Sequence, residues 1–492
     1  MTPHLPALQI VIPLVAAPLC MLVRYRDWAW GVALMASWLA FGISWLLLQQ
    51  VLAGGPISYA MGGWSAPIGI EYRVDLLNAF VLLIVSAIGS VMMPYARHSV
   101  THEFGHQRTY MFYTAYLLCF TGLLGVTITG DAFNLFVFLE ISSLSSYVLI
   151  ALGNDRRALT AAYQYLVMGT IGATFIVIGI GLLYSETGTL NMVDLAERIA
   201  QMPPNRTIGA AFGFLVVGIS LKLALFPLHL WLPNAYTYAP SMVSAFLAAT
   251  ATKVAVYVLL RFLFSVFRVD LSFGVMPLDM VLLGLAVIAM FAASTVAIFQ
   301  NNLKRMLAYS SVAQIGYMIL GISFTNVTGL TATLLHLFNH AMMKGGMFLA
   351  LGCIVLRVGS ATIGDLHGIG RRMPWSTAAF VIGGLSLIGV PLTVGFISKW
   401  YLVLAAIERG WWGVGLLIVL SSLLAVAYIW RVVEIAYFQR PPTGAAHVEE
   451  APLSMLIPTW ILIGASVYFG INTELTVDVA GRAAVALFGA GS

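Results

Sequence analysis

Long apolar runs separated by short polar loops constrain this 492-residue chain more than any other feature of its sequence. A helix that crosses a bilayer needs about 20 mainly apolar residues. We count fourteen such runs, near residues 5–23, 29–53, 75–95, 109–129, 132–152, 162–184, 207–226, 240–265, 278–299, 304–321, 328–356, 376–400, 411–437 and 453–470. A spanning sheet would have to alternate and close into a barrel, and no such alternation competes. The sequence therefore predicts an all-α integral membrane protein.

The composition agrees with this fold class, because 60% of the residues are hydrophobic and only 9% are charged. A soluble domain carries about 25% charged residues. No polar segment is long enough to form a soluble domain, so we expect residues 1–492 to form a single polytopic membrane domain. The three cysteines lie in apolar runs without a CxxC partner, which argues against a disulfide framework or a zinc site. We expect the first run to be a retained helix rather than a signal peptide.

The basic residues predict the orientation of the chain. Fourteen spans place both termini on one side, and that topology puts thirteen loop Lys and Arg residues opposite the termini and seven beside them. Cytoplasmic loops carry the excess of Lys and Arg. We therefore expect a multi-pass protein of the bacterial inner membrane with both termini on the periplasmic side. The basic loops are scattered, so nucleic acid is not an expected partner.

Lysine is used in an unusual way. The chain has only five lysines, and Lys222, Lys253, Lys344 and Lys399 all lie within apolar spans, while the loops use arginine almost exclusively. A desolvated lysine can lose its proton, whereas arginine cannot. This pattern favours protonation changes inside the membrane. The alternative is structural: an interhelical hydrogen bond, or a lysine that extends to the interface.

Glu140 is the one acidic residue that is plainly in mid-membrane. A charge at that depth costs roughly 2.5–3.5 kcal/mol on insertion scales, so it needs a partner. Lys222 lies beside an expected helix break, because Pro227 should end its helix and the break must face protein or water. A static pair that only ties two helices together is the alternative. His229 lies near the break and is a possible accessory residue.

His336, His340 and Lys344 follow one another at four-residue intervals in LHLFNHAMMKGGMFLALG. Each step rotates about 40° around a helix, so the three form one polar stripe. Histidine titrates near neutrality, which suits proton transfer. A polar seam between helices remains open. Haem ligation is disfavoured, because both histidines share one helix face and cannot grip an iron from opposite sides.

A second interrupted span precedes Lys399, because Gly389, Pro391 and Gly395 lie within GLSLIGVPLTVGFISKW. Two interrupted spans in corresponding places of two halves indicate an inverted repeat. The internal sequence similarity is weak, so the repeat is an inference from the interruptions.

Together these motifs resemble the proton-pumping, antiporter-like membrane subunits of respiratory complex I, Mrp-type cation/proton antiporters and membrane-bound hydrogenases. The resemblance covers nearly the whole chain and rests on TGDAFNLFVFLEISSLSSYVLIALG, LYSETGTLNM, LKLALFPLHLWLPNAYTYAPSMVSAFLAATATKVAVY, NNLKRMLAYSSVAQIGYM, LFNHAMMKGGMFLALG and GVPLTVGFISKW. It implies about fourteen transmembrane helices, with two inverted five-helix repeats at helices 4–8 and 9–13 and with helices 7 and 12 broken.

The resemblance also implies site residues. It implies a proton relay of Glu140, Lys222, Lys253, His336, His340, Lys344 and Lys399. Opening of the Glu140–Lys222 pair would send a proton toward Lys253, then across the stripe to Lys399. The expected partners are other membrane subunits, protons and a monovalent cation. No metal and no cofactor is expected.

The TGD and GTLNM segments look most like those of the D subunit of an Mrp-type Na⁺/H⁺ antiporter. Two alternatives stay open: a pumping subunit of a complex I-type NADH-quinone oxidoreductase or membrane-bound hydrogenase, and a structural or quinone-binding subunit of such a complex. A stand-alone secondary transporter is a further reading. In each case the chain is not expected to be catalytic by itself.

Overall fold

The computed structural model describes residues 4–104, 109–203, 205–440 and 448–489. Within them, thirteen helices or helix pairs are long and apolar enough to cross a bilayer. They are α1 (Leu5–Val23), α2 (Arg26–Gly54), α3 (Leu76–Phe104), α4 (Thr109–Ile128), α5 (Ala132–Ala151), α6 (Arg157–Thr187), α8 (Arg206–Leu223), α10 with α11 (Ser241–Ala249 and Ala251–Leu260), α12 (Leu278–Ile298), α13 (Leu303–Ser323), α14 (Val327–Val358), α18 (Trp412–Val433) and α19 (Leu453–Ile471). The predicted all-helical membrane fold is confirmed.

The remaining expected span, 376–400, is divided into α16 (Pro374–Ile388) and α17 (Val394–Glu408). The smaller elements are β1 (Ile57–Ala60), η2 (Met61–Gly63), β2 (Glu71–Val74), α7 (Met192–Gln201), α9 (Trp231–Tyr238), η3 (Arg261–Val266), η4 (Asp270–Val275), η5 (Ile363–Leu366), α15 (Ile369–Arg372), η6 (Glu434–Phe438) and α20 (Glu474–Gly489). β1 and β2 form an antiparallel hairpin in which Ile57 pairs with Val74. The sequence analysis did not anticipate α20, which follows the last expected span.

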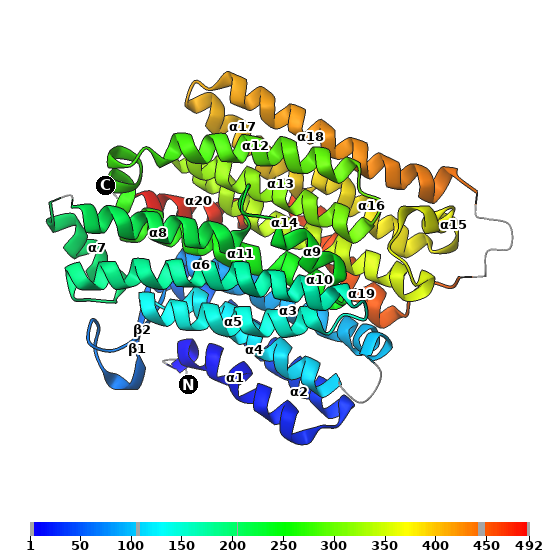
Figure 1. Ribbon diagram of the computed structural model, residues 1–492, viewed down its shortest axis with the longest axis horizontal. Coiled ribbons are helices and arrows are strands. Elements are labelled where there is room, and N and C mark those ends of the chain that lie inside the picture. Colours follow the sequence, from blue (N-terminus) through cyan, green and yellow to red (C-terminus); the bar gives the residue numbers. More distant parts are fainter. Residues whose placement is uncertain (1–3, 105–108, 204, 441–447, 490–492) are drawn as a thin grey trace.

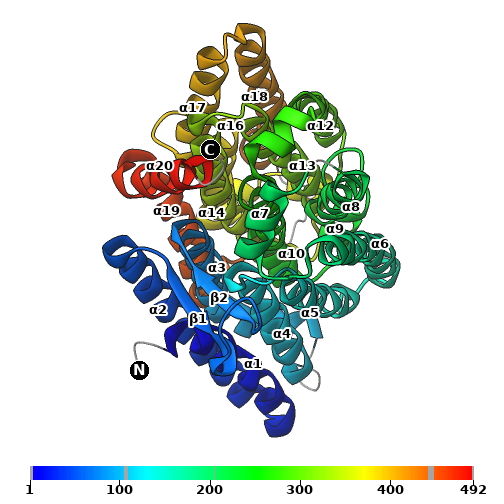
Figure 2. The same cartoon turned by 90° about the vertical axis from the view of Figure 1, so that its left-hand side faces the viewer.

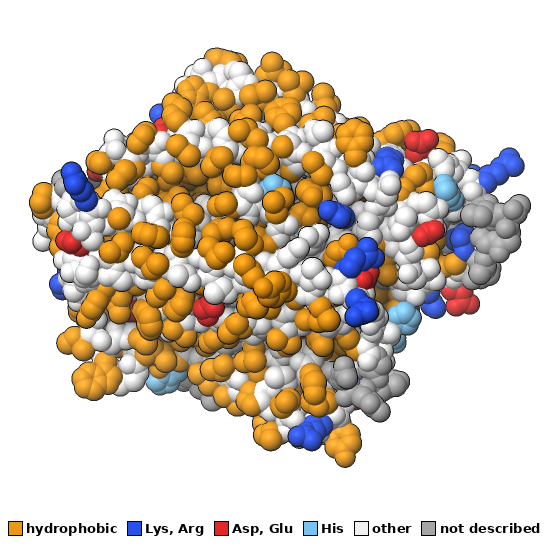
Figure 3. All heavy atoms as spheres, viewed as in Figure 1, with side chains coloured by type: hydrophobic (Ala, Val, Ile, Leu, Met, Phe, Trp, Pro, Cys, Tyr) orange, Lys and Arg blue, Asp and Glu red, His pale blue; other side chains and the backbone are white. Residues whose placement is uncertain are grey.

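The long helices run side by side, with the hairpin, α7 and both marked chain ends at one end of the bundle (Figure 1). On the face that Figure 3 shows, the surface between the two ends is mostly hydrophobic, and Lys and Arg gather chiefly at the end that holds α15. We refer to this as the basic end. An apolar belt with charges at its two ends is the surface that a bilayer requires.

Two sets of five helices repeat. Asp131 and Asn302 cap the N-termini of α5 and α13, each accepting from the backbone N–H three residues on. Each cap residue also forms an isolated bridge, Asp131 with Asn191 and Asn302 with Thr362, a shift of 171 residues at both positions. The third helices, α6 and α14, have 31 and 32 residues. Corresponding helices of the two sets are five membrane crossings apart. Because five is an odd number, each helix of the second set runs in the opposite direction to its counterpart in the first.

α14 is the central helix, and its residues from Gly329 to Ile354 are all buried. It packs against α3, α10, α13, α16, α17, α19 and α20, which surround it in the end-on view (Figure 2). Its two glycines do not loosen it, since α14 continues through Gly345 and Gly346. A Cβ at Gly346 would meet Ile463 at 2.5 Å, so this glycine lets α19 approach closely.

Candidate functional site: a buried line of ionisable groups

Lys222 and Glu140 form an ion pair between α8 and α5. The Lys222 Nζ lies 3.4 Å from Glu140 Oε1 and donates to Ser143 Oγ at 2.8 Å. The Lys222 side chain is 6% exposed and that of Glu140 is 25% exposed, so the carboxylate lies at the border of the bundle. The structure therefore places together the two residues whose pairing the family resemblance implies.

The break beside Lys222 follows from Pro227. α8 ends at Leu223, four residues before the proline, which is the carbonyl position with which a proline ring clashes. Ala224 then adopts a left-handed conformation at φ 59°. The Leu221 carbonyl accepts from the Trp231 indole of α9 at 3.0 Å and from the Ala224 N–H at 3.3 Å. A backbone group that the break exposes is thus satisfied within the protein, as a membrane interior requires.

Lys253 lies beside a break that the sequence analysis missed. The eighth span is divided at Thr250 into α10 and α11, because Thr250 has non-helical angles of φ −124° and ψ −57°. The Lys253 ammonium is fully buried and donates to the freed Ala248 carbonyl and to Thr252 Oγ1. No Pro or Gly marks this position, so the local sequence carries no signal for it.

A cavity of about 40 Å³ lies beside Lys222 and the start of α11. Its lining includes Ser143 and Lys222 on one side and Ala251 on the other, close to Lys253 in sequence. A site needs roughly 10–15 Å³ of such volume to hold a water, so this cavity has room for one or a few. Its walls supply the hydroxyl and ammonium partners that an ordered water needs.

His336, His340 and Lys344 lie along one side of α14 and are fully buried. The two imidazole rings are nearly parallel, with centroids 6.1 Å apart. Lys344 donates to the Leu307 carbonyl at 2.9 Å and to the Ser310 hydroxyl, both on α13. Within the described part of the chain, neither ring nitrogen of His340 has a hydrogen-bond partner.

Lys399 lies after its helix break and reaches back across it. Its Nζ donates to the carbonyls of Leu387 at 3.0 Å and Ile388 at 2.8 Å, the last residues of α16. It also donates to Ser422 Oγ of α18 at 2.9 Å. A cation at a helix C-terminus is stabilised by the partial negative charge there.

Two residues that the sequence did not single out lie between the stripe and Lys399. The Lys399 Nζ lies 4.8 Å from the centre of the Tyr317 ring, which is 5.7 Å from the His336 ring. Ser398 Oγ lies 2.8 Å from His336 Nδ1. Serine and tyrosine are ordinary residues in spans, so only the folded structure identifies these two.

Lys304 and His229 lie apart from this line. Lys304 is buried and donates to the Ala239 carbonyl at the end of α9, so it fixes the start of α13. The His229 ring stacks on Phe226 with centroids 5.1 Å apart and faces Tyr309 at 6.4 Å. These contacts are packing contacts, and none of them joins His229 to the predicted relay residues.

Further polar residues lie between Lys253 and the end opposite the basic end. Tyr257 and Arg261 follow Lys253 at four-residue steps on α11 and η3. Arg261 bonds to Tyr257 Oη at 3.1 Å and forms an ion pair with Asp75 at 2.5 Å. These three residues line a pocket of about 200 Å³.

Comparisons with known proteins place this site in context. The family model described as NADH:quinone oxidoreductase/Mrp antiporter, TM, matches residues 129–425. NADH-quinone oxidoreductase subunit N of Desulforudis audaxviator (strain MP104C) is 41% identical, over 97% of this chain and 98% of that protein. The D subunit of the Na(+)/H(+) antiporter of Bacillus subtilis (strain 168) is 28% identical, over 98% and 96%.

Among solved structures, the membrane-bound sulfane sulfur reductase, an archaeal respiratory membrane complex, contains a chain that superposes with a TM-score of 0.91. That chain is 30% identical, and the alignment covers 99% of this chain and 98% of the other.

Proposed function

Because the chain belongs to the NADH:quinone oxidoreductase/Mrp antiporter membrane family, we propose that it translocates protons as a subunit of a redox-driven complex of the complex I type. It is an antiporter-like subunit of Mrp or complex I-type complexes. The choice of the redox branch rests on the 41% identity to an N subunit of an NADH-quinone oxidoreductase and on the close superposition with a chain of a respiratory reductase. The Mrp reading, which the TGD and GTLNM wording favours, becomes the second candidate.

The observation that carries the proposal is the Glu140–Lys222 ion pair beside a helix break. An ion pair at bilayer depth is costly to separate. Opening the pair therefore stores free energy, and closing it releases that free energy. When Glu140 is drawn away, Lys222 loses its anion and releases its proton more readily. The nearby cavity supplies a place for a water that carries this proton toward Lys253.

The remaining groups act as successive proton carriers. From Lys253 the proton passes to His340 and Lys344, then along His336 to the neighbourhood of Tyr317 and Lys399. The contacts that support this order are the 6.1 Å spacing of the two imidazoles and the position of the Tyr317 ring between His336 and Lys399. These groups interact, so an apparent pKa describes the whole line of groups and not a single residue.

We also propose the orientation and the assembly. The basic end faces the cytoplasm, because Lys and Arg gather there and cytoplasmic loops carry the positive excess. Both chain ends then lie on the outer side of a bacterial inner membrane, and residues 1–492 act as one membrane domain. The partners are other membrane subunits, which supply the redox step that this chain does not perform by itself.

The Mrp-type antiporter remains the second candidate function, because the similarity to the D subunit of the B. subtilis antiporter extends over nearly the whole chain. In that case the protons are exchanged for a monovalent cation such as Na⁺. The two candidates differ in what drives proton movement: an electron donor in the first and a cation gradient in the second.

The test uses inside-out vesicles that contain the native complex with Glu140→Gln or Lys222→Met. Proton uptake is followed with a pH-sensitive dye, after addition of an electron donor in one arm and of a Na⁺ gradient in the other. We expect donor-driven uptake in the parent and loss of most of it in both variants. Glu474→Gln is the matched control, because Glu474 is exposed at the start of α20.

Uptake that needs Na⁺ and no donor supports the Mrp reading instead. If both variants pump as the parent does while the complex stays assembled, the relay is not used. The structural or quinone-binding reading then gains support.

A further inference from the structure

A basic pocket of about 590 Å³ lies at the basic end, between the start of α2 and the ends of α3 and α14. Its lining includes Arg26, Arg97, His98, His102 and Arg357. None of these residues belongs to the buried line of lysines and histidines. Three guanidinium groups at one membrane end raise the question of what anion they attract.

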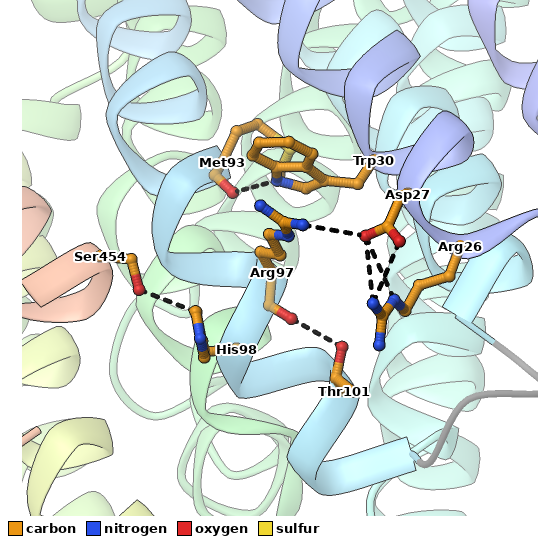
Figure 4. Close-up of polar contacts among 8 residues, drawn as sticks. All are labelled: Arg26, Asp27, Trp30, Met93, Arg97, His98, Thr101 and Ser454. Carbon is orange, nitrogen blue, oxygen red and sulfur yellow. Dashed lines mark hydrogen bonds and ion pairs between the residues drawn. The ribbon is translucent and has the colours of Figure 1, made fainter. Parts of the chain in front are cut away.

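Arg26, Arg97 and His98 of this pocket all make polar contacts with neighbouring residues (Figure 4). The Arg97 guanidinium lies 4.8 Å from the centre of the Trp30 ring and donates to Asp27 Oδ1 at 3.3 Å. Arg26 pairs with the same carboxylate at 3.1 Å. The Trp30 indole is itself held by a 2.9 Å hydrogen bond to the Met93 carbonyl. Groups that are already ordered lose little conformational freedom when a ligand binds.

The other wall of the pocket is held in the same way. Arg357 donates from Nε and Nη2 to the Glu450 carbonyl at 3.0 and 2.8 Å. His98 Nδ1 lies 2.8 Å from Ser454 Oγ, at the start of α19. Two side chains from α3 and α14 are therefore anchored to the segment that leads into α19.

The charge of the pocket is positive. Asp27 is the carboxylate that Arg26 and Arg97 share, while the described residues that line the pocket include three arginines and no acid. The Arg97 side chain is 46% exposed, so its charge is accessible. Guanidinium groups bind phosphate oxygens through pairs of charge-assisted hydrogen bonds. The chemistry of the pocket therefore suits a phosphate-bearing anion.

An apolar groove of about 430 Å³ begins at the same Asp27 and extends along α2. It is lined by Trp28, Gly31, Leu34 and Met35, and no side chain fills the space beside Gly31. Trp28 is 70% exposed and Met35 is 65% exposed. Because α2 is a membrane span, this groove faces the acyl chains of the bilayer.

We propose that the basic pocket and the apolar groove together bind an anionic phospholipid. The phosphate lies among Arg97, Arg357 and Arg26, and an acyl chain lies along α2 beside Gly31. Basic pockets between helices on the cytoplasmic side recognise anionic headgroups, and each Arg or Lys adds to the attraction. A free phosphate ion leaves the groove unused, and an acidic loop from a neighbouring protein of the complex does not reach into the acyl region.

The test compares spin-labelled phosphatidylglycerol with spin-labelled phosphatidylcholine in phosphatidylcholine vesicles that hold the full-length chain. The motionally restricted fraction of each lipid gives its relative association constant. We expect a clear preference for phosphatidylglycerol, and Arg97→Gln with Arg357→Gln lowers this preference by about thirtyfold. Trp28→Ala with Met35→Ala lowers it without any change of charge.

The matched control is Arg409→Gln with Arg482→Gln, which removes the same charge at the opposite end and leaves the preference intact. Equal association of the two lipids with the parent chain overturns the proposal. So does complete competition by inorganic phosphate, which indicates a free-anion site. A structure of the assembled complex with polypeptide in this pocket overturns it as well. Unchanged thermal unfolding of each variant shows that the fold persists.

Discussion

Lys222 lies before the break in its helix and Lys399 lies after the break in its own. The two ammonium groups have different kinds of partner. Lys399 follows its break and donates to the last carbonyls of α16. Lys222 precedes its break, and there the Trp231 indole satisfies the Leu221 carbonyl instead. Lys222 is thereby left to pair with Glu140. The Lys222 ammonium is therefore not needed to hold its helix together.

Lys399→Arg separates the charge of this residue from its ability to release a proton. Arginine keeps a cation near the end of α16 but stays protonated at any pH that the protein experiences. We expect the variant to assemble and its proton uptake to fall by about a hundredfold, the usual contribution of one proton-transfer group. Vesicle uptake together with blue-native electrophoresis checks both parts. Uptake at the parent rate means that Lys399 only caps α16.

Tyr317 lies between His336 and Lys399, and two substitutions test which part of it matters. Tyr317→Phe keeps the ring against Lys399 but removes the hydroxyl that donates to Ser421 Oγ at 2.9 Å. Loss of one hydrogen bond costs about 1 kcal/mol of stability. We expect near-parent proton uptake in Tyr317→Phe and a marked loss in Tyr317→Leu. Equal uptake in both variants shows that the ring has no role in the relay.

His340 carries polar atoms that the described structure leaves without hydrogen-bond partners. A buried polar group in that condition costs about 1–3 kcal/mol. His340→Leu therefore raises the thermal unfolding midpoint while it abolishes proton uptake. His340→Gln serves as the polar control and gives no such gain in stability. A lower midpoint in His340→Leu indicates that internal waters satisfy the imidazole in the membrane.

Gly395 allows α17 to approach α16. A Cβ at this position would meet the Ser386 carbonyl oxygen at 1.7 Å, so Gly395→Ala must displace backbone. Overpacking of this kind costs about 1–3 kcal/mol, and the twelfth span also holds Lys399. We expect reduced assembly and weak uptake from whatever assembles. Gly413→Ala is the matched control, because nothing lies within 4 Å of its added Cβ.

The parts of the site that could be predicted from the sequence are those where a charge or a proline interrupts an apolar run. Glu140 and Lys222 were identifiable because a charge inside an apolar run needs a partner, and the interruption near Pro227 was expected because proline ends helices. The break at Thr250 was missed, since neither Pro nor Gly marks it in the sequence. Tyr317 and Ser398 were missed because neither carries a charge, and their importance comes from their neighbours in space.

The position of α20 has a consequence for how the protein is made. α20 and α19, the last two helices of the chain, both cover α14, which carries His336, His340 and Lys344. During synthesis, α14 leaves the ribosome more than a hundred residues before α20 is complete. The helix that carries the three stripe residues is therefore made before one of its covering helices exists. A chain that stopped at Ile471 would lack α20 and leave the side of α14 that packs against it uncovered.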